Sequence, residues 1–262
     1  MSLIDSHCHL NYEGLVERQD EVLDAARARG VTGMLNISTR QREWDDIVAT
    51  AERNEDVWAT IGVHPHEADN HPDLGVEALI EAAAHPKVVA IGECGLDYYY
   101  DKSDRDAQKA RFEAHIEAAR ATGLPLVVHT REAEEDTATI LRRAVDKGGV
   151  RGVLHCFTSS QWLADEALDF GFYISLSGIV TFKNAKDLQA TAKTLPEDRY
   201  LVETDSPFLA PVPNRGKTCE PAFVVDTTEF VADLRDSTMD DVKAQTTANF
   251  FRLFDKAKPV AS

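Results

Sequence analysis

The sequence lacks the features that direct a chain into or across a membrane. It opens with a short apolar run and two histidines, without the basic segment and apolar core of a signal peptide. Its apolar runs are too short to span a bilayer. We therefore expect a cytoplasmic protein that does not associate with membranes.

Cysteine is scarce and has no recognisable spacing. The four cysteines are Cys8, Cys94, Cys156 and Cys219, and no two of them are spaced Cys-x-x-Cys. A disulfide framework is not expected in a chain of 262 residues of this class. We expect reduced side chains and assign none of them as a metal ligand.

Positive charge is also in short supply. The chain has 28 Lys and Arg against 45 Asp and Glu, so its formal net charge is −17. This balance argues against a protein that coats duplex nucleic acid through a basic face. It does not exclude a nucleic-acid substrate, because bound divalent cations can supply positive charge where a phosphate lies.

Short β-rich runs recur at about the spacing of one βα unit. The segments between them have helical periodicity: residues 15–29 stop at Gly30, and residues 103–122 begin with a Ser-x-x-Asp cap and stop at Gly123. The eight expected strands are residues 3–5, 33–37, 57–62, 88–92, 126–128, 153–154, 172–175 and 200–202.

This alternation predicts an α/β fold, a single (β/α)8 barrel of the TIM type that forms one domain over residues 1–262. An open doubly wound sheet would usually have a Gly-rich phosphate loop after its first strand, which the chain lacks. A Pro-rich loop, residues 206–213, leads into a C-terminal helical extension. We interpret its aromatic residues as packing residues: Phe223, Phe230, Phe250, Phe251 and Phe254.

Imidazoles and acids follow nearly all of the expected strands. Residues i and i+2 of an extended chain share a face, so His7 and His9 form a candidate metal-ligand pair. The C-terminal ends of barrel strands meet at one mouth, where active sites form. Chance explains this placement poorly, because five of the nine histidines and two acids belong to the set: His7, His9, His64, Glu93, His129, His155 and Asp205.

These ligands exceed the needs of one tetrahedral ion. We expect two divalent ions, one held by His7, His9 and Asp205 and the other by His129 and His155, with Glu93 bridging them. Mixed nitrogen and oxygen ligation suits Zn2+, Mn2+ or iron, and hydrated Mg2+ also fits. Such a pair of ions activates water for hydrolysis. We expect Glu93 and Asp205 to be catalytic, Asp205 as a proton acceptor as well as a ligand.

Seven motifs resemble the TatD family of metal-dependent deoxyribonucleases, within the amidohydrolase-like barrel superfamily, and especially its YcfH-type members. They are DSHCHL (5–10), GVHPH (62–66), IGECGLDYYY (91–100), VVHTRE (127–132), LHCFT (154–158), GFYISLSGIVTFKNA (171–185) and LVETDSPFLAPVPNRGK (201–217). The resemblance covers nearly the whole chain. It departs at Cys94, where relatives more often carry Thr or Ile.

The resemblance implies a divalent-metal centre at six positions, those of His7, His9, Glu93, His129, His155 and Asp205. It also implies a 3'-5' exonuclease that hydrolyses DNA phosphodiester bonds, with Mg2+ as the usual activating ion. We expect a monomer acting on single-stranded DNA or 3' ends. The alternative is a metal-dependent ester or amide hydrolase, such as a D-aminoacyl-tRNA deacylase. A non-enzymatic metal protein is disfavoured, because a structural site would be closed and need fewer ligands.

Three further residues are candidates for substrate binding. His64 at the predicted mouth is interpreted as a group behind the metal ligands or a donor to the scissile phosphate, although it could instead cap the loop after the third strand. Arg131 and Arg215 lie in expected mouth loops and could position phosphates. The Tyr98 to Tyr100 run either stacks an unpaired base or packs its loop against a helix.

Overall fold

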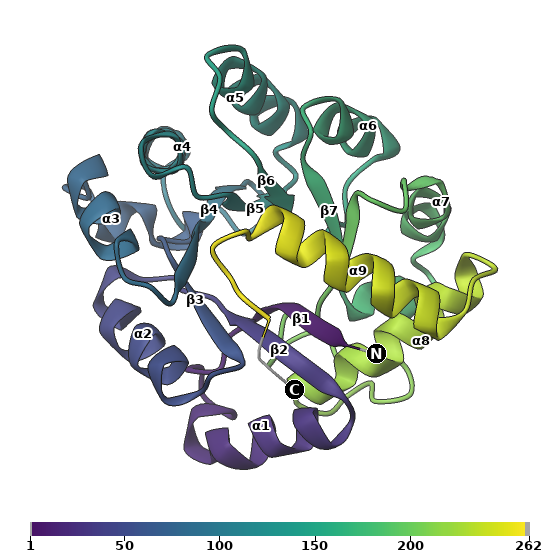
Figure 1. Ribbon diagram of the computed structural model, residues 1–262. Coiled ribbons are helices and arrows are strands. Elements are labelled where there is room, and N and C mark those ends of the chain that lie inside the picture. The colour runs from purple at the N-terminus through teal and green to yellow at the C-terminus, as the bar shows by residue number, and fades with distance from the viewer. Residues whose placement is uncertain (1, 260–262) are drawn as a thin grey trace.

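The computed structural model describes residues 2–259, in which eight strands pair in chain order and every neighbouring pair is parallel (Figure 1). The strands are β1 (Leu3–Cys8), β2 (Val31–Asn36), β3 (Val57–Ile61), β4 (Val88–Asp97), β5 (Leu126–Arg131), β6 (Gly152–Leu154), β7 (Tyr173–Leu176) and β8 (Tyr200–Val202). The α-helices are α1 (Gln19–Ala28), α2 (Trp44–Arg53), α3 (Val76–Ala83), α4 (Arg105–Thr122), α5 (Glu134–Asp146), α6 (Gln161–Asp169), α7 (Lys186–Thr194), α8 (Val224–Leu234) and α9 (Met239–Leu253). Within residues 2–259, no helix combines the length and apolar character needed to cross a bilayer.

The two ends of the sheet meet between β1 and the segment after β8. The amide of Asp205 donates to the carbonyl of His7 at 2.9 Å, and the amide of His9 donates to the carbonyl of Ser206 at 2.8 Å. Below them, the buried carboxylate of Asp5 accepts from the amide and the hydroxyl of Thr204, at 2.9 and 2.6 Å. The result is a nearly closed (β/α)8 barrel of the TIM type, as predicted, and its seam joins the two chain segments that carry His7, His9 and Asp205.

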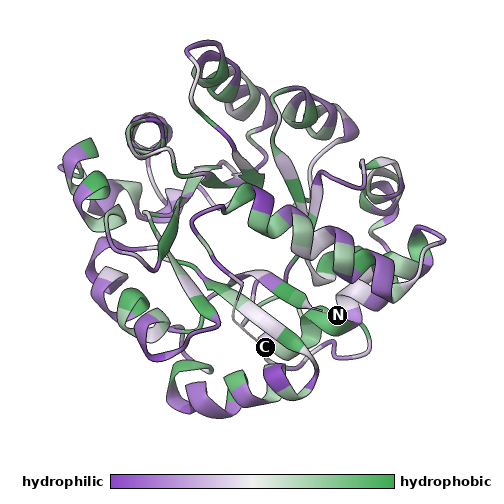
Figure 2. Ribbon diagram, viewed as in Figure 1, coloured by the Kyte–Doolittle hydropathy of each residue, from purple (hydrophilic) through white to green (hydrophobic). Residues whose placement is uncertain are grey.

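Two apolar cores hold the barrel together. One lies between the strands and the surrounding helices, whose outward faces are hydrophilic (Figure 2). The other fills the interior from Ile4 to Leu201, where α9 crosses the ring of strands (Figure 1) and contributes Phe250, with Phe254 directly after its last residue. The predicted C-terminal extension is thus a plug at one end of the barrel. Its five aromatics all pack: Phe250 and Phe254 are fully buried, and Phe223, Phe230 and Phe251 are partly buried.

Three strands extend at least three residues further toward the mouth than the sequence predicted. β1, β4 and β5 continue through His7, Glu93 and His129, so these side chains lie within strands and not after them. Pairing between β4 and β5 continues at Gly95 and His129. A side chain at position 95 would clash with the His129 carbonyl, because a Cβ there would lie 2.0 Å from that oxygen. Glycine therefore permits the extra pairing and gives His129 a rigid backbone.

Two predicted helix starts were wrong. The 15–29 segment begins with a short 3-10 turn at Val16–Arg18 before α1, and α4 is capped by Asp104 in place of Ser103. The Asp104 carboxylate accepts from the amides of Asp106 and Ala107, at 2.9 and 3.2 Å. A carboxylate next to the first turn satisfies these free amides directly, which leaves the Ser103 hydroxyl to donate to the His66 carbonyl at 2.9 Å.

His115, on α4, makes stability depend on pH. Its Nε2 accepts from the Val63 amide at 2.9 Å, its Nδ1 donates to the Arg111 carbonyl at 2.7 Å, and burial lowers its pKa to about 4. The unfolded chain takes up a proton near pH 6.5 and the folded chain does not, so stability falls as pH drops below that value. Between pH 7.5 and 5.5 we expect this residue to account for a loss of about 1.4 kcal/mol in the free energy of unfolding.

Urea denaturation with chelator present, at both pH values, measures this loss. His115→Gln should be less stable than the wild type at pH 7.5, but its free energy of unfolding should fall less on acidification, by about 1.4 kcal/mol. Equal falls in the two proteins would contradict the assignment of this pH dependence to His115.

Candidate metal centre

The histidine pair of β1 faces Asp205 across the seam of the barrel. The Nε2 atoms of His7 and His9 are 3.3 Å apart. Asp205 Oδ1 lies 3.3 Å from His9 Nε2 and 3.6 Å from His7 Nε2. These three residues form one group whose nitrogen and oxygen atoms could hold a metal ion. The seam hydrogen bonds fix the backbones of all three, which keeps the group in place.

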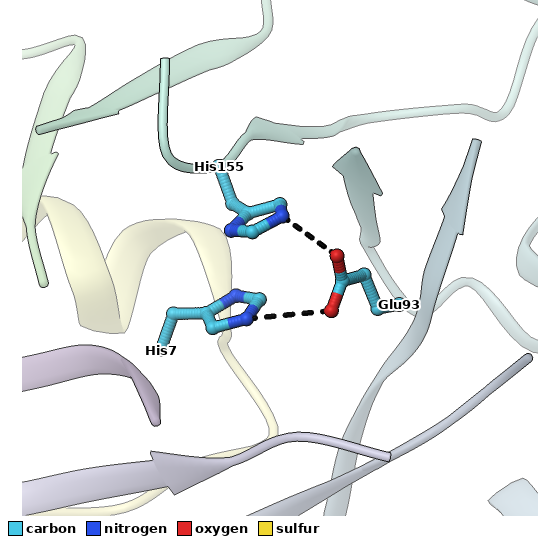
Figure 3. A group of neighbouring side chains, drawn as sticks. All are labelled: His7, Glu93 and His155. Atoms are coloured by element: carbon cyan, nitrogen blue, oxygen red, sulfur yellow. Dashed lines mark ion pairs between the residues drawn. The ribbon is translucent and has the colours of Figure 1, made fainter. Parts of the chain in front are cut away.

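Glu93 lies at the centre of the remaining imidazoles. Figure 3 shows its carboxylate between His7 and His155, with one oxygen directed at each ring. Oε1 is 2.8 Å from His155 Nε2 and 3.3 Å from both His64 Nε2 and His129 Nδ1. Oε2 is 3.5 Å from His7 Nε2 and 3.9 Å from His9 Nε2. One buried carboxylate therefore contacts five imidazoles from four segments of the barrel.

The ionisation of Glu93 and His155 follows from this contact. Burial alone would raise the pKa of Glu93, but the nearby imidazoles, chiefly His155 and His64, hold this pKa well below its usual range. Burial likewise opposes a charge on His155, but Glu93 and Glu203 raise the pKa of His155 well above its usual value. The site thus pairs an ionised Glu93 with a protonated His155, and a bound divalent ion would supply the positive charge in place of that proton.

Two acids that the sequence analysis did not single out orient the imidazoles from behind. Asp97 Oδ2 lies 3.0 Å from His129 Nε2, which leaves the Nδ1 of that ring directed at Glu93. Glu203 Oε1 lies 3.4 Å from His155 Nδ1, which leaves the Nε2 of that ring directed at Glu93. Carboxylates in this position fix the orientation and tautomer of metal-binding histidines.

The sequence held a signal for only one of these two acids. Glu203 directly follows the expected strand 200–202, at the same position as the predicted ligands of other strands. Asp97 lies five residues beyond the predicted end of the fourth strand at Gly92, and only the observed continuation of β4 brings it to His129.

The donor atoms fit divalent metal ions. Within residues 2–259 they form three overlapping groups: His7, Glu93 and His155; His7, His9 and Asp205; His64, Glu93 and His129. His155 Nε2 is buried and makes no well-directed hydrogen bond in the described structure, although Glu93 Oε1 lies 2.8 Å from it. Imidazole nitrogens and ionised carboxylates directed at one another are a donor set that Zn2+ and Mn2+ accept, and a bound ion would displace the proton from His155.

The grouping differs from the predicted partition in two respects. His155 groups with His7, and His129 groups with His64, whereas the sequence interpretation paired His129 with His155. His64 therefore lies among the potential ligands and not only behind them. Its Nδ1 also accepts from the His66 amide at 3.1 Å, so it caps the loop after β3 as well.

A cavity of about 670 Å³ opens above these groups. Its lining includes six of the seven predicted mouth residues, all except His7: His9, His64, Glu93, His129, His155 and Asp205. Arg131, one of the predicted substrate-binding residues, also lines it. Arg215 is not part of the lining, and its guanidinium lies 3.7 Å from the centre of the Phe182 ring. This stacking accounts for the place of Arg215 outside the lining.

Comparisons with known proteins agree with this geometry. The profile of the family described as TatD related DNase matches residues 4–255. The metal-dependent hydrolase YcfH of Escherichia coli K12 is 45% identical over 259 residues, covering 97% of this chain and 96% of YcfH. The protein named 3'-5' ssDNA/RNA exonuclease TatD, from Klebsiella pneumoniae, is 35% identical over 241 residues, covering 90% of this chain and 91% of that protein.

The fold of a solved relative is also close. The crystal structure of YjjV, a TatD homologue from Escherichia coli, superimposes with a TM-score of 0.91 at 26% identity and covers 97% of this chain and 98% of its own. The family match spans every candidate ligand and, apart from Leu3, all residues of the eight strands. Together with the imidazole and carboxylate groups at the mouth of the barrel, it establishes that this chain is a metal-dependent hydrolase and belongs to the TatD related DNase family.

Proposed function

We propose that this hydrolase is a 3'-5' exonuclease that cleaves DNA phosphodiester bonds. The observation that carries the proposal is the contact of Glu93 with five imidazoles directly beneath an open cavity, with Asp205 beside them. The name of the Klebsiella pneumoniae relative supports the nuclease assignment. The proposed metal ligands are His7, His9, Glu93, His129, His155 and Asp205, and we propose two bound divalent ions, Mg2+, Mn2+ or Zn2+.

The ions, when bound, supply Lewis-acid stabilisation of phosphate charge and activation of water. Glu93 holds the centre of the site from a position that is almost inaccessible to solvent. Asp205 faces the cavity, with 13% of its side chain exposed. We therefore propose Asp205 as the group that accepts a proton from the attacking water, and Arg131 as a cation that positions the phosphate.

The acidic surface favours a substrate that contacts the protein only inside the cavity. With a formal net charge of −17, the chain would repel a long duplex over most of its surface. An unpaired 3' end can enter the cavity and meet the positive charge of the ions and Arg131 alone. We propose single-stranded DNA as the substrate, and a cytoplasmic monomer of one domain as the active form.

A panel of substrates tests the proposal. Single-stranded DNA, bis-p-nitrophenyl phosphate, a lactone and a D-aminoacyl-tRNA are each incubated with Mg2+, Mn2+, Zn2+ or a chelator. We expect release of mononucleotides from the 3' end of the DNA with at least one metal, and loss of at least about 99% of that activity after chelation. Turnover of the lactone or the aminoacyl-tRNA without any of the phosphodiesters would refute the nuclease proposal and favour the alternative.

A further inference from the structure

The walls of the cavity differ in chemistry. One side is apolar and comes from the segments after β1, β7 and β8: Tyr12, Ile179, Phe208 and Leu209. The opposite side carries the ring of Tyr100 beside cations. Cations come from the end of β5 and from segments after β2 and β4: Arg131, Arg40 and Lys102. Because the strands follow one another around the barrel, β8 and β1 lie across the ring from β4 and β5. The candidate metal ligands lie between an apolar wall and a wall that carries positive charge.

Phe208 is the exposed ring of the apolar wall. It is 48% exposed, and its centroid lies 6.0 Å from that of Tyr12 and 6.3 Å from that of His9. Its amide donates to the Asp205 carbonyl at 3.0 Å, so the ring is tied to the segment that carries a candidate ligand. Tyr12 stacks on His9 at 4.6 Å and is held by a 2.6 Å hydrogen bond to Thr39. An exposed ring beside two fixed rings is a surface on which a flat group can stack.

The opposite wall offers cations without carboxylate partners. Arg131 lies over the rings of Tyr99 and Tyr100, at 4.1 and 4.8 Å, and Lys102 lies 5.5 Å from the Tyr100 ring. Within residues 2–259, neither cation has an acid within ion-pair distance. Arg40 is different, because Glu43 and Glu67 each lie within 2.9 Å of it. Arg131 and Lys102 are therefore the cations that remain available to phosphates.

We propose that this cavity binds a single strand in one orientation, an inference that rests on the proposed exonuclease function. The base of the 3'-terminal nucleotide stacks on Phe208, and the phosphates of the preceding nucleotides lie toward Arg131 and Lys102. The terminal nucleoside has no phosphate beyond the scissile one, so it requires a stacking surface. The rest of the strand carries one negative charge per nucleotide, so it requires cations.

The test uses three substrates that separate the two walls: a single-stranded decanucleotide, the same strand ending in a 3' abasic residue, and a dinucleotide. Phe208→Leu and Arg131→Gln are compared with the wild type. Phe208→Trp keeps a stacking ring, and Trp162→Ala removes an aromatic side chain on α6 that is 46% exposed and outside the cavity lining. The measurements are KM with metal, equilibrium binding by fluorescence anisotropy, and Mn2+ affinity.

Phe208→Leu should raise KM about tenfold for the decanucleotide and the dinucleotide, but less than about twofold for the abasic strand. Phe208→Trp and Trp162→Ala should each keep KM close to the wild-type value. Arg131→Gln should weaken binding of the decanucleotide more than that of the dinucleotide. It should also reduce the magnitude of the slope of log binding constant against log salt concentration by about 0.7. Mn2+ affinity should be unchanged in Phe208→Leu.

The inference is overturned if Phe208→Leu raises KM for the abasic strand as much as for the normal decanucleotide. It is also overturned if Arg131→Gln weakens binding of the dinucleotide as much as binding of the decanucleotide. A failure of the proposed function would be visible separately. In that case no oligonucleotide is cleaved by any of the proteins, while the anisotropy measurements still decide the orientation of binding.

Discussion

Glu93→Gln should lower kcat by about a thousandfold or more, equivalent to ~4 kcal/mol, and leave the barrel folded. Glutamine keeps the shape of the side chain, but it removes the negative charge that faces five imidazoles and places an amide group within 3.5 Å of four of them. The loss of this charge should weaken binding of divalent ions as well. Calorimetric titration with Mn2+ and single-strand hydrolysis measure the two effects.

Glu43→Gln is the matched control for this variant. Glu43 accepts from Arg40 at 2.9 Å near the same face of the barrel, but it does not line the cavity. Its substitution should change kcat by less than about twofold, as expected for a weak surface ion pair. If Glu93→Gln kept near-full activity with metal in excess, the central role assigned to Glu93 would be wrong.

Asp205→Asn should lower kcat by about a hundredfold to a thousandfold while weakening Mn2+ binding only by about tenfold. Asparagine can still offer an oxygen to an ion, but it cannot accept a proton from water. The burial of Asp205 would by itself raise its pKa, and the hydrogen bond to His9 together with His7 and His155 lowers it below the ordinary value. A proton acceptor must be ionised in this way at neutral pH.

The backbone makes this substitution a clean test. Asp205 has a φ of 57°, a left-handed conformation that Asn adopts more readily than most residues. Asp236, between α8 and α9, has a φ of 52° and is not part of the cavity lining, so Asp236→Asn is the matched control. Both variants should melt within about 4 °C of the wild type. Equal activities of the two variants under metal-replete conditions would exclude Asp205 from the chemistry.

The predicted fold was confirmed, and it was predictable because the sequence patterns that indicate it are local. Each βα unit has an apolar strand followed by an amphipathic helix, so eight alternations indicate the barrel before any long-range contact is known. The convergence of the candidate ligands was predictable for the same reason, since parallel strands place their C-terminal ends at one mouth. The placement of Arg215 was not predictable from the sequence, because it depends on stacking with Phe182, a contact between two loops.

The sequence by itself determined the barrel, the residue types at its mouth and the family. Only the tertiary structure decided how these residues are grouped: that Glu93 contacts five imidazoles, that His64 joins His129, and that Asp97 and Glu203 orient the rings from behind. The physical reason is that grouping depends on strand stagger and on the extra pairing of β4 with β5 beyond Gly92. Displacements of a few ångströms set by packing around the whole ring decide which donor atoms meet.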